Sequence, residues 1–263
     1  MNILESKKDK KGILRLTLND PNNKNALSEL MIKQLSDALN EATEDKSIRV
    51  IVIAATGNVF CSGHNLKEII NTRNDHENKE AYFLSLFKAC SLLMQSIIKS
   101  PKPVIAEVNG VATAAGCQLV ASCDLAISSE SAKFATPGVN IGLFCSTPMV
   151  ALSRNVSKKD SMMMLLTGDM VNAEEAKRIS LINDYVAEDE LTKTTMDLAE
   201  KIASKSSIVL KIGKKAFYEQ AQLNLEEAYE YTSMVMVKNM MKNDAVEGIN
   251  SFLEKRKPKW SDK

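Results

Sequence analysis

The spacing of apolar residues predicts several strands in the first half of the chain. Residues 2–18 hold two short strand candidates on either side of the charged turn at 7–12, which indicates a β-hairpin. Apolar runs predict further strands at 50–55, 103–108 and 124–128. A strand in which every residue is apolar is buried on both faces of its sheet. The run at 50–55 is of this kind, so it favours a parallel sheet flanked by helices.

Apolar positions at helical spacing predict helices between and after these strands. One helix begins after the capping residue Ser28, and a long amphipathic helix covers 81–99. The polar stretch at 71–79 predicts a mobile connection. From residue 157 onward helices dominate, with predicted ranges 160–166, 173–178, 190–203, 209–222, 225–239 and 244–255.

The order of these elements predicts the fold class and a division of the chain. Strands that alternate with helices are typical of an α/β fold with crossover connections. Composition shifts at 204–207, where serine and lysine interrupt the apolar pattern. We therefore expect a core over 1–204 and a helical region over 205–263.

Composition narrows the function classes. The 263 residues include 34 Lys and Arg against 33 Asp and Glu, a net charge of +1, which argues against a nucleic-acid partner. Five cysteines without metal-ligand spacing and only two histidines predict no structural metal and a reducing compartment. Residues 1–8 lack the pattern of a secretion or transit signal, and we find no apolar run long enough to cross a membrane. The sequence thus predicts a cytoplasmic protein without a membrane partner.

Candidate chemistry lies where two strands are followed by turns of small residues. The stretch 108–119 passes from a strand to a helix through Ala112–Gly116, where little side chain separates the backbone from a ligand. The segment 60–66 makes a second turn of this kind. Backbone N–H groups in such turns suit a carbonyl oxygen that gains negative charge.

Motifs in a fixed order give these turns a family context. They are Asn25–Leu27, Phe60–Lys67, Pro101–Ala106 with Asn109–Gly110, Cys123–Asp124, Leu166–Gly168 with Ala173–Ala176, and Glu247–Gly248 with Phe252–Arg256. Together they resemble the crotonase (enoyl-CoA hydratase/isomerase) superfamily along essentially the whole chain. The resemblance implies a crotonase-like right-handed spiral of repeated strand-strand-helix units with a C-terminal helical trimerisation region. It also implies a homotrimer, or a hexamer built as a dimer of trimers.

The same resemblance implies an acyl-CoA thioester as substrate, with coenzyme A as part of it and no separate cofactor. The thioester oxygen would lie between the backbone N–H groups of His64 and Ala115, an oxyanion hole in which each donor contributes about 2.7 to 4 kcal/mol. Further positions match the binding of coenzyme A, and they are Lys24, Ala26, His64, Asn65, Leu66 and Lys67. The segment 162–166 matches a wall of the acyl pocket.

The sequence departs from the hydratase pattern at the acid-base positions. Gln118 and Gly138 stand where hydratases carry two glutamates, and Ser146 stands where some isomerases carry a third acid. None of these side chains transfers protons near neutral pH, and general acid-base groups typically contribute about 10² to 10⁴ in rate. Residues 135–148 resemble a subgroup called enoyl-CoA hydratase domain-containing protein 3, which also lacks these acids. Its animal members are mitochondrial, whereas the N-terminus here favours bacterial cytoplasm.

Alternatives stay open for several side chains and for the function. The His64 side chain could act as a base, but we favour a contact with solvent or coenzyme A. The Gln118 amide either orients a water molecule or bonds to nearby backbone. Asn140 either faces the space at Gly138 or makes a local turn bond. Cys117 and Cys145 are interpreted as buried, inert thiols. The resemblance therefore leaves three expected functions open: an enoyl-CoA hydratase/isomerase-like enzyme, a catalytically silent acyl-CoA-binding or assembly protein, or a catalyst of a base-independent step such as acyl-CoA decarboxylation.

Overall fold

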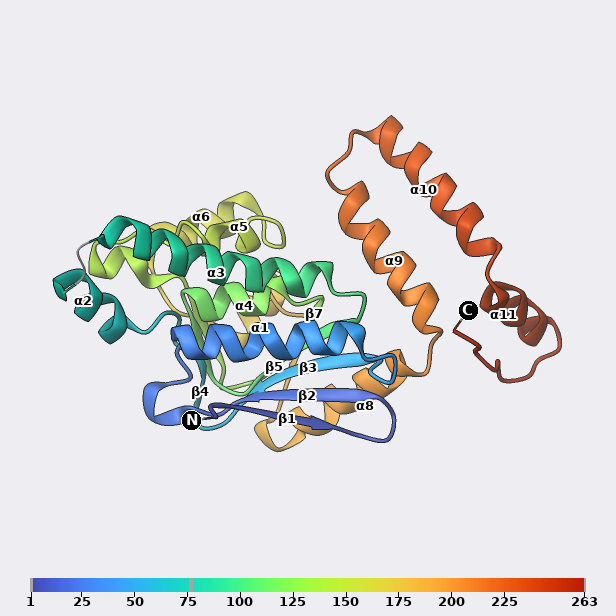
Figure 1. The fold of residues 1–263 in the computed structure, drawn as a ribbon, viewed down its shortest axis with the longest axis horizontal. Coiled ribbons are helices and arrows are strands. Elements are labelled where there is room, and N and C mark those ends of the chain that lie inside the picture. The colour runs from blue at the N-terminus through green and yellow to red at the C-terminus, as the bar shows by residue number, and fades with distance from the viewer. Residues whose placement is uncertain (1, 76–77, 263) are drawn as a thin grey trace.

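A computed structural model describes residues 2–75 and 78–262 and shows two sheets wrapped by helices (Figure 1). The first sheet has six strands in the order β1 (Leu4–Lys8), β2 (Ile13–Leu18), β3 (Val50–Ala55), β5 (Val104–Val108), β7 (Leu125–Ser129) and β10 (Asp184–Val186). β1 and β2 form the predicted antiparallel hairpin, and the other neighbours are parallel.

The second sheet consists of four short strands, namely β4 (Val59–Cys61), β6 (Val111–Thr113), β8 (Lys133–Ala135) and β9 (Val171–Asn172). In the chain, β3 of the large sheet is followed by β4 of the small sheet and then by a helix. β5 is followed in the same way by β6 and a helix. The fold is therefore a mixed α/β fold with strand-strand-helix units, as the motifs predicted. The apolar pattern missed the small sheet and also β10 of the large sheet, because strands of two or three residues are too short to show a period.

Helices cover both faces of the six-stranded sheet. One side carries α1 (Glu29–Glu44), α2 (Leu66–Asp75), α3 (Lys79–Lys99), α4 (Ala115–Ser122), α5 (Pro148–Leu152), α6 (Lys158–Thr167) and α7 (Ala173–Arg178) around the main core. α8 (Leu191–Ala203) covers the other side, where Ala199 packs with Val50, Val52 and Ile105. The continuous apolar strand at 50–55 is buried on both faces for this reason.

Two expectations are corrected by the helices. Residues 71–75, expected as part of a mobile connection, belong to α2, while 76 and 77 of that stretch lie outside the described residues. α3 is long and apolar enough to cross a membrane by length and composition, contrary to the expectation that no such run exists. It packs on α1 and buries Leu86, Leu93 and Ile97, and a core helix of a globular domain can pass the same test.

The last helices project from the body, as Figure 1 shows at the right of the view. They are α9 (Ser207–Gln220), α10 (Leu225–Met240) and α11 (Asn243–Leu253). The Lys214 ammonium of α9 donates to the Asp124 carboxylate at 2.6 Å and to the Ile97 and Lys102 carbonyls, and the Tyr218 hydroxyl donates to the other Asp124 oxygen. This buried cluster joins α9 to the body. The division at residue 204 stays a prediction.

Candidate functional site

Two turns that are far apart in the sequence meet at the small sheet. β4 and β6 are parallel neighbours, with Cys61 opposite Ala112. Gly63, in the turn after β4, has φ of 88°, and a Cβ there would lie 2.9 Å from the Ala114 Cβ and 3.2 Å from the Ala115 nitrogen. Glycine is required because a side chain would push the two turns apart.

The backbone N–H groups of His64 and Ala115 have no acceptor in the part of the chain that the structure describes. Among the residues that the structure describes, neither group donates a hydrogen bond. Ala115 is buried and is the first residue of α4, where helix geometry leaves the N–H groups without intrahelical acceptors. Buried backbone donors without a partner are rare, so this pair can receive an oxygen atom from a ligand.

Ala114 holds an unusual backbone conformation between these donors. Its φ of 51° and ψ of −118° lie in a region that L-residues seldom occupy, at a cost of about 1 to 3 kcal/mol. The Ala114 N–H donates to the Ala135 carbonyl at 2.9 Å, and its carbonyl accepts the Gln118 N–H at 3.0 Å, so both sides of the residue are held. Sequence analysis missed this residue because alanine gives no signal for a positive φ.

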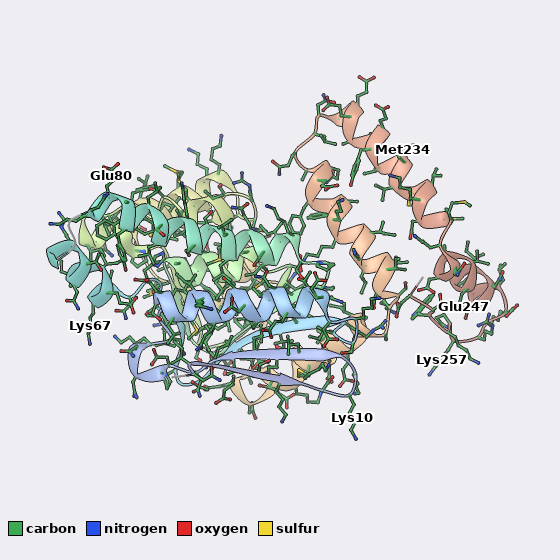
Figure 2. All side chains as sticks on the ribbon, in the orientation of Figure 1. Lys10, Lys67, Glu80, Met234, Glu247 and Lys257 are labelled. Atoms are coloured by element: carbon green, nitrogen blue, oxygen red, sulfur yellow. The ribbon has the colours of Figure 1, made fainter. Side chains whose placement is uncertain are left out.

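The predicted coenzyme A positions lie beside the same turns. The Leu27 N–H donates to the Gly63 carbonyl at 2.7 Å, and the Ser62 N–H donates to the Lys24 carbonyl at 3.2 Å. Ala26 is buried in this loop, whereas Lys24 is exposed. The Asn65 Oδ1 accepts the Lys67 N–H at 3.0 Å at the start of α2, where Leu66 and Lys67 are exposed. The structure brings all six positions to one neighbourhood, and Figure 2 shows the Lys67 side chain at the outer edge of the body.

The positions of the missing carboxylates differ in how much room they leave. Gln118 is buried in the first turns of α4, and its Oε1 has no hydrogen-bond partner within the described part of the chain. Gly138 is buried in a 3-10 helix, Pro137–Ile141, where a Cβ would lie 2.7 Å from the Leu143 carbonyl oxygen and 3.0 Å from the Cys145 Sγ. The loop after this helix thus fills the space that a glutamate would need.

Two neighbouring positions are also placed. Asn140 is exposed, with its Nδ2 2.9 Å from where a Cβ on Gly168 would lie, so its amide lies against that glycine. Ser146 is exposed and its hydroxyl donates to the Phe144 carbonyl. Thr136, which sequence analysis did not single out, is buried next to Gly138 with its hydroxyl unpaired among the described residues. A buried hydroxyl cannot be distinguished from an exposed one by residue type alone.

The cysteines near the turns are thiols and not thiolates. Burial raises the pKa of Cys61 and of Cys117 to about 12, and burial also raises the pKa of Cys145. A thiol in this state is a poor nucleophile and a poor metal ligand. In the described ranges there is no group of three His, Cys, Asp or Glu residues that could hold a metal ion. A groove of about 940 Å³ between α1 and α3 is lined by other residues.

The His64 side chain is enclosed by its neighbours. Its ring meets the Phe87 ring edge-on, with 5.4 Å between centroids, and both ring nitrogens are buried without a hydrogen-bond partner in the described chain. Burial lowers the pKa of the imidazole, and the nearby Leu27 carbonyl offsets part of that effect without meeting hydrogen-bond geometry. The ring is therefore neutral near pH 7. Its nitrogens do not contact solvent, which corrects one of the two contacts that the sequence favours, while the contact with coenzyme A stays a prediction.

Comparison with known proteins identifies the class that this fold and site define. A family model described as enoyl-CoA hydratase/isomerase matches residues 8–263. The chain therefore belongs to the enoyl-CoA hydratase/isomerase family, the crotonase superfamily.

The subgroup resemblance is also confirmed. Enoyl-CoA hydratase domain-containing protein 3 of Homo sapiens is 49% identical over 251 residues, which cover 95% of this chain and 81% of the human protein. The crystal structure of the human protein has a TM-score of 0.93 at 46% identity and covers 98% of this chain and 100% of that one. An enoyl-CoA hydratase of Mycobacterium smegmatis has a TM-score of 0.94 at 45% identity, with 99% of each chain covered.

These relatives contradict the expected cytoplasmic location. The frog, mouse and human proteins of the subgroup are all named as mitochondrial. The expectation depended on the composition of residues 1–8, of which Leu4–Lys8 form β1 and pair with β2. Targeting information is read separately from the fold, so the physical chemistry of the core could not correct that expectation.

Proposed function

We propose that the chain binds acyl-CoA thioesters and stabilises the enolate form of the thioester. The observation that carries this proposal is the packing of Gly63 against Ala114 and Ala115, in adjoining turns whose N–H groups at His64 and Ala115 have no acceptor among the described residues. In the proposal, the N–H groups of His64 and Ala115 donate to the thioester oxygen. Fixed donors of this kind, in a site from which water is excluded, stabilise a developing negative charge without reorganising.

The coenzyme A moiety is proposed to lie along the loop of Lys24 and Ala26 and the start of α2 at Asn65, Leu66 and Lys67. The two exposed lysines attract phosphate groups as point charges. Membership of a family named for enoyl-CoA reactions supports a thioester ligand. No further cofactor is needed for binding or for enolate stabilisation.

We propose further that the chain forms a homotrimer or a hexamer through the region 205–263. Every residue of α10 is described and none is buried. Five of its apolar side chains are more than half exposed, namely Leu225, Tyr229, Met234, Met236 and Val237. Figure 2 shows Met234 on this projecting helix, away from the body. Apolar surface of this extent is typical of an interface.

Hydration is not the reaction that the site supports best. Gln118 cannot exchange a proton near neutral pH, and the loop at Leu143 and Cys145 fills the space beside Gly138. A hydratase needs glutamate carboxylates at both of these positions to hold and activate a water molecule. A catalytically silent acyl-CoA-binding protein remains the second candidate. The non-titrating Gln118 and the filled space beside Gly138 favour a chain that has lost catalysis and kept binding.

Carbonyl polarisation tests the proposal directly. Butyryl-CoA labelled with ¹³C at the thioester carbonyl is bound to the full chain, and the carbonyl stretch is followed by isotope-edited infrared spectroscopy. Two strong hydrogen bonds shift the band to lower frequency. Ala115→Pro removes one donor and is expected to reverse part of the shift, with Gly213→Ala, a change in open space on α9, as a matched control. A bound ligand with an unshifted band in the unmodified protein would refute the proposal.

Turnover separates the two candidates. A screen of acyl-CoA esters that shows a shifted carbonyl band and no reaction identifies a silent binding protein. Turnover that falls together with the band shift in Ala115→Pro identifies an enzyme. Hydration of crotonyl-CoA at a rate typical of hydratases would contradict the interpretation of Gln118 and Gly138.

A further inference from the structure

The last described residues of the chain turn back along α11. This helix ends at Leu253, and Lys255 reverses the chain with a φ of 55°, the left-handed conformation typical of helix ends. The Arg256 N–H donates to the Ser251 carbonyl at 2.9 Å and holds this reversal. Residues 257–262, here named the C-terminal strap, then reach the region between α8 and α9, and Figure 1 shows the C-terminus between α11 and α9.

Motif residues hold the strap against α11. The Arg256 guanidinium donates to both Glu247 carboxylate oxygens, at 2.7 and 2.8 Å. The Trp260 ring lies over Gly248, 3.5 Å from where a Cβ would lie, and its indole N–H donates to the Ser204 carbonyl at 2.8 Å. Glu247, Gly248 and Arg256 belong to the motifs that resemble the family, and the proposed function does not use them. Their contacts give these positions a role in placing the strap.

The Asp244 carboxylate lies where α11, the strap and the α8–α9 connection meet. It is 2% exposed and accepts hydrogen bonds from the Ser206 hydroxyl at 2.5 Å, from the Ser261 N–H and hydroxyl at 2.7 and 2.8 Å, and from the Asp262 N–H at 3.1 Å. Burial alone would raise the pKa of Asp244, but these hydrogen bonds together lower that pKa. The carboxylate is therefore ionised near neutral pH, and hydrogen bonds to an ionised group are about twice as strong as neutral ones.

Arg49 joins the strap to the body. It directly precedes β3, and its guanidinium donates to the Ala203 and Lys205 carbonyls at 2.7 Å each. The same group pairs with the Asp262 carboxylate at 2.9 Å, and the other Asp262 oxygen accepts the Ser207 N–H at 2.7 Å. The strap thus ties the end of α11 to the start of α9. Because α10 packs on both α9 and α11, it lies between two fixed ends.

We propose that the C-terminal strap closes α9, α10 and α11 into a rigid arm and so fixes the direction in which α10 presents its exposed apolar side chains. Release of the strap frees the end of α11 and leaves α10 joined to the body through α9. An arm that is free to move must be ordered when copies of the chain associate, and that ordering weakens the assembly. The effect on assembly rests on the proposed oligomer, whereas the strap itself rests on contacts within one chain.

Limited digestion with trypsin tests the strap in the full chain. Trypsin cleaves after Lys205, an exposed residue whose carbonyl accepts from Arg49, and mass spectrometry follows the fragment 206–263. Asp244→Asn keeps the shape of the side chain and removes its charge, so cleavage should be about 10- to 100-fold faster because local opening costs less. Asp197→Asn, in an exposed ion pair on α8, is the matched control and should be cleaved like the unmodified protein.

A second readout separates the strap from the proposed oligomer. Because the strap lies within one chain, faster cleavage in Asp244→Asn should not depend on protein concentration. Light scattering after size exclusion should show that Asp244→Asn dissociates at concentrations where Asp197→Asn stays assembled. Equal cleavage of Asp244→Asn and the unmodified protein overturns the strap, and faster cleavage with unchanged assembly overturns its effect on association.

Two further outcomes are distinguishable. An unmodified protein that is monomeric overturns the proposed oligomer, while the digestion still decides on the strap. If Asp244→Asn does not fold, Trp260→Phe keeps an aromatic ring over Gly248 and removes the hydrogen bond to the Ser204 carbonyl. Cleavage of Trp260→Phe after Lys205 should then be faster than in the control, and an unchanged rate contradicts the strap.

Discussion

Gly138→Ala tests whether the chain has closed the space of the second hydratase glutamate. The new Cβ would lie 2.7 Å from the Leu143 carbonyl oxygen, 3.0 Å from the Cys145 Sγ and 3.3 Å from the Cys145 nitrogen. Two of these atoms belong to backbone, so the loop must move as a unit. Overpacking of this kind costs about 1 to 3 kcal/mol, and replacing glycine returns about 0.4 to 1 kcal/mol through the unfolded chain.

The net destabilisation worked from these values is about 1 to 2 kcal/mol. For a protein of this size that corresponds to a fall in Tm of about 2 to 8 °C, which differential scanning calorimetry can measure. Gly213→Ala is the matched control. It has no atom within 4 Å of the new Cβ and lies in the interior of α9, so Tm should stay the same or rise.

The contact between the Gly138 position and the loop at Leu143 also predicts the outcome of an activity measurement. Gln118→Glu restores one carboxylate, and adding Gly138→Glu should give no further hydration of crotonyl-CoA because the loop occupies the space of the second side chain. The reasoning is refuted if Gly138→Ala leaves Tm unchanged and the double variant hydrates crotonyl-CoA much faster than Gln118→Glu alone.

Three further predictions concern other parts of the chain. Lys214→Met leaves the Asp124 carboxylate buried without its cation and should cost about 3 to 5 kcal/mol in chemical unfolding, whereas Lys215→Met, on an exposed pair, should cost less than about 1 kcal/mol. Because burial lowers the pKa of His64, the unfolded chain binds more protons below about pH 6.5. Stability should therefore fall as pH drops from 7 to 5, and His64→Phe should reduce that fall in thermal melts. Ala114→Gly removes a strained φ and should leave Tm unchanged or raise it by the equivalent of up to about 2 kcal/mol; a lower Tm would contradict the strain.

The sequence alone determined the order of the longer helices and strands and the family. Continuous apolar strands such as 50–55 and helices with a wide apolar face carry a periodic signal along the chain, and the motifs around Phe60–Lys67 and Asn109–Gly110 identified the superfamily. It also showed that Gln118 and Gly138 cannot titrate, because that depends on residue type only.

Only the tertiary structure decided how the site is built. Three features depend on how the folded chain packs. Gly63 lies against Ala114, the loop at Leu143 fills the space beside Gly138, and the His64 ring nitrogens have no partner among the described residues. Residue type and spacing specify which groups a chain carries and which face of an element they occupy. Burial, hydrogen-bond partners and free volume are set by the other elements that pack around them, so they can be read only from the folded chain.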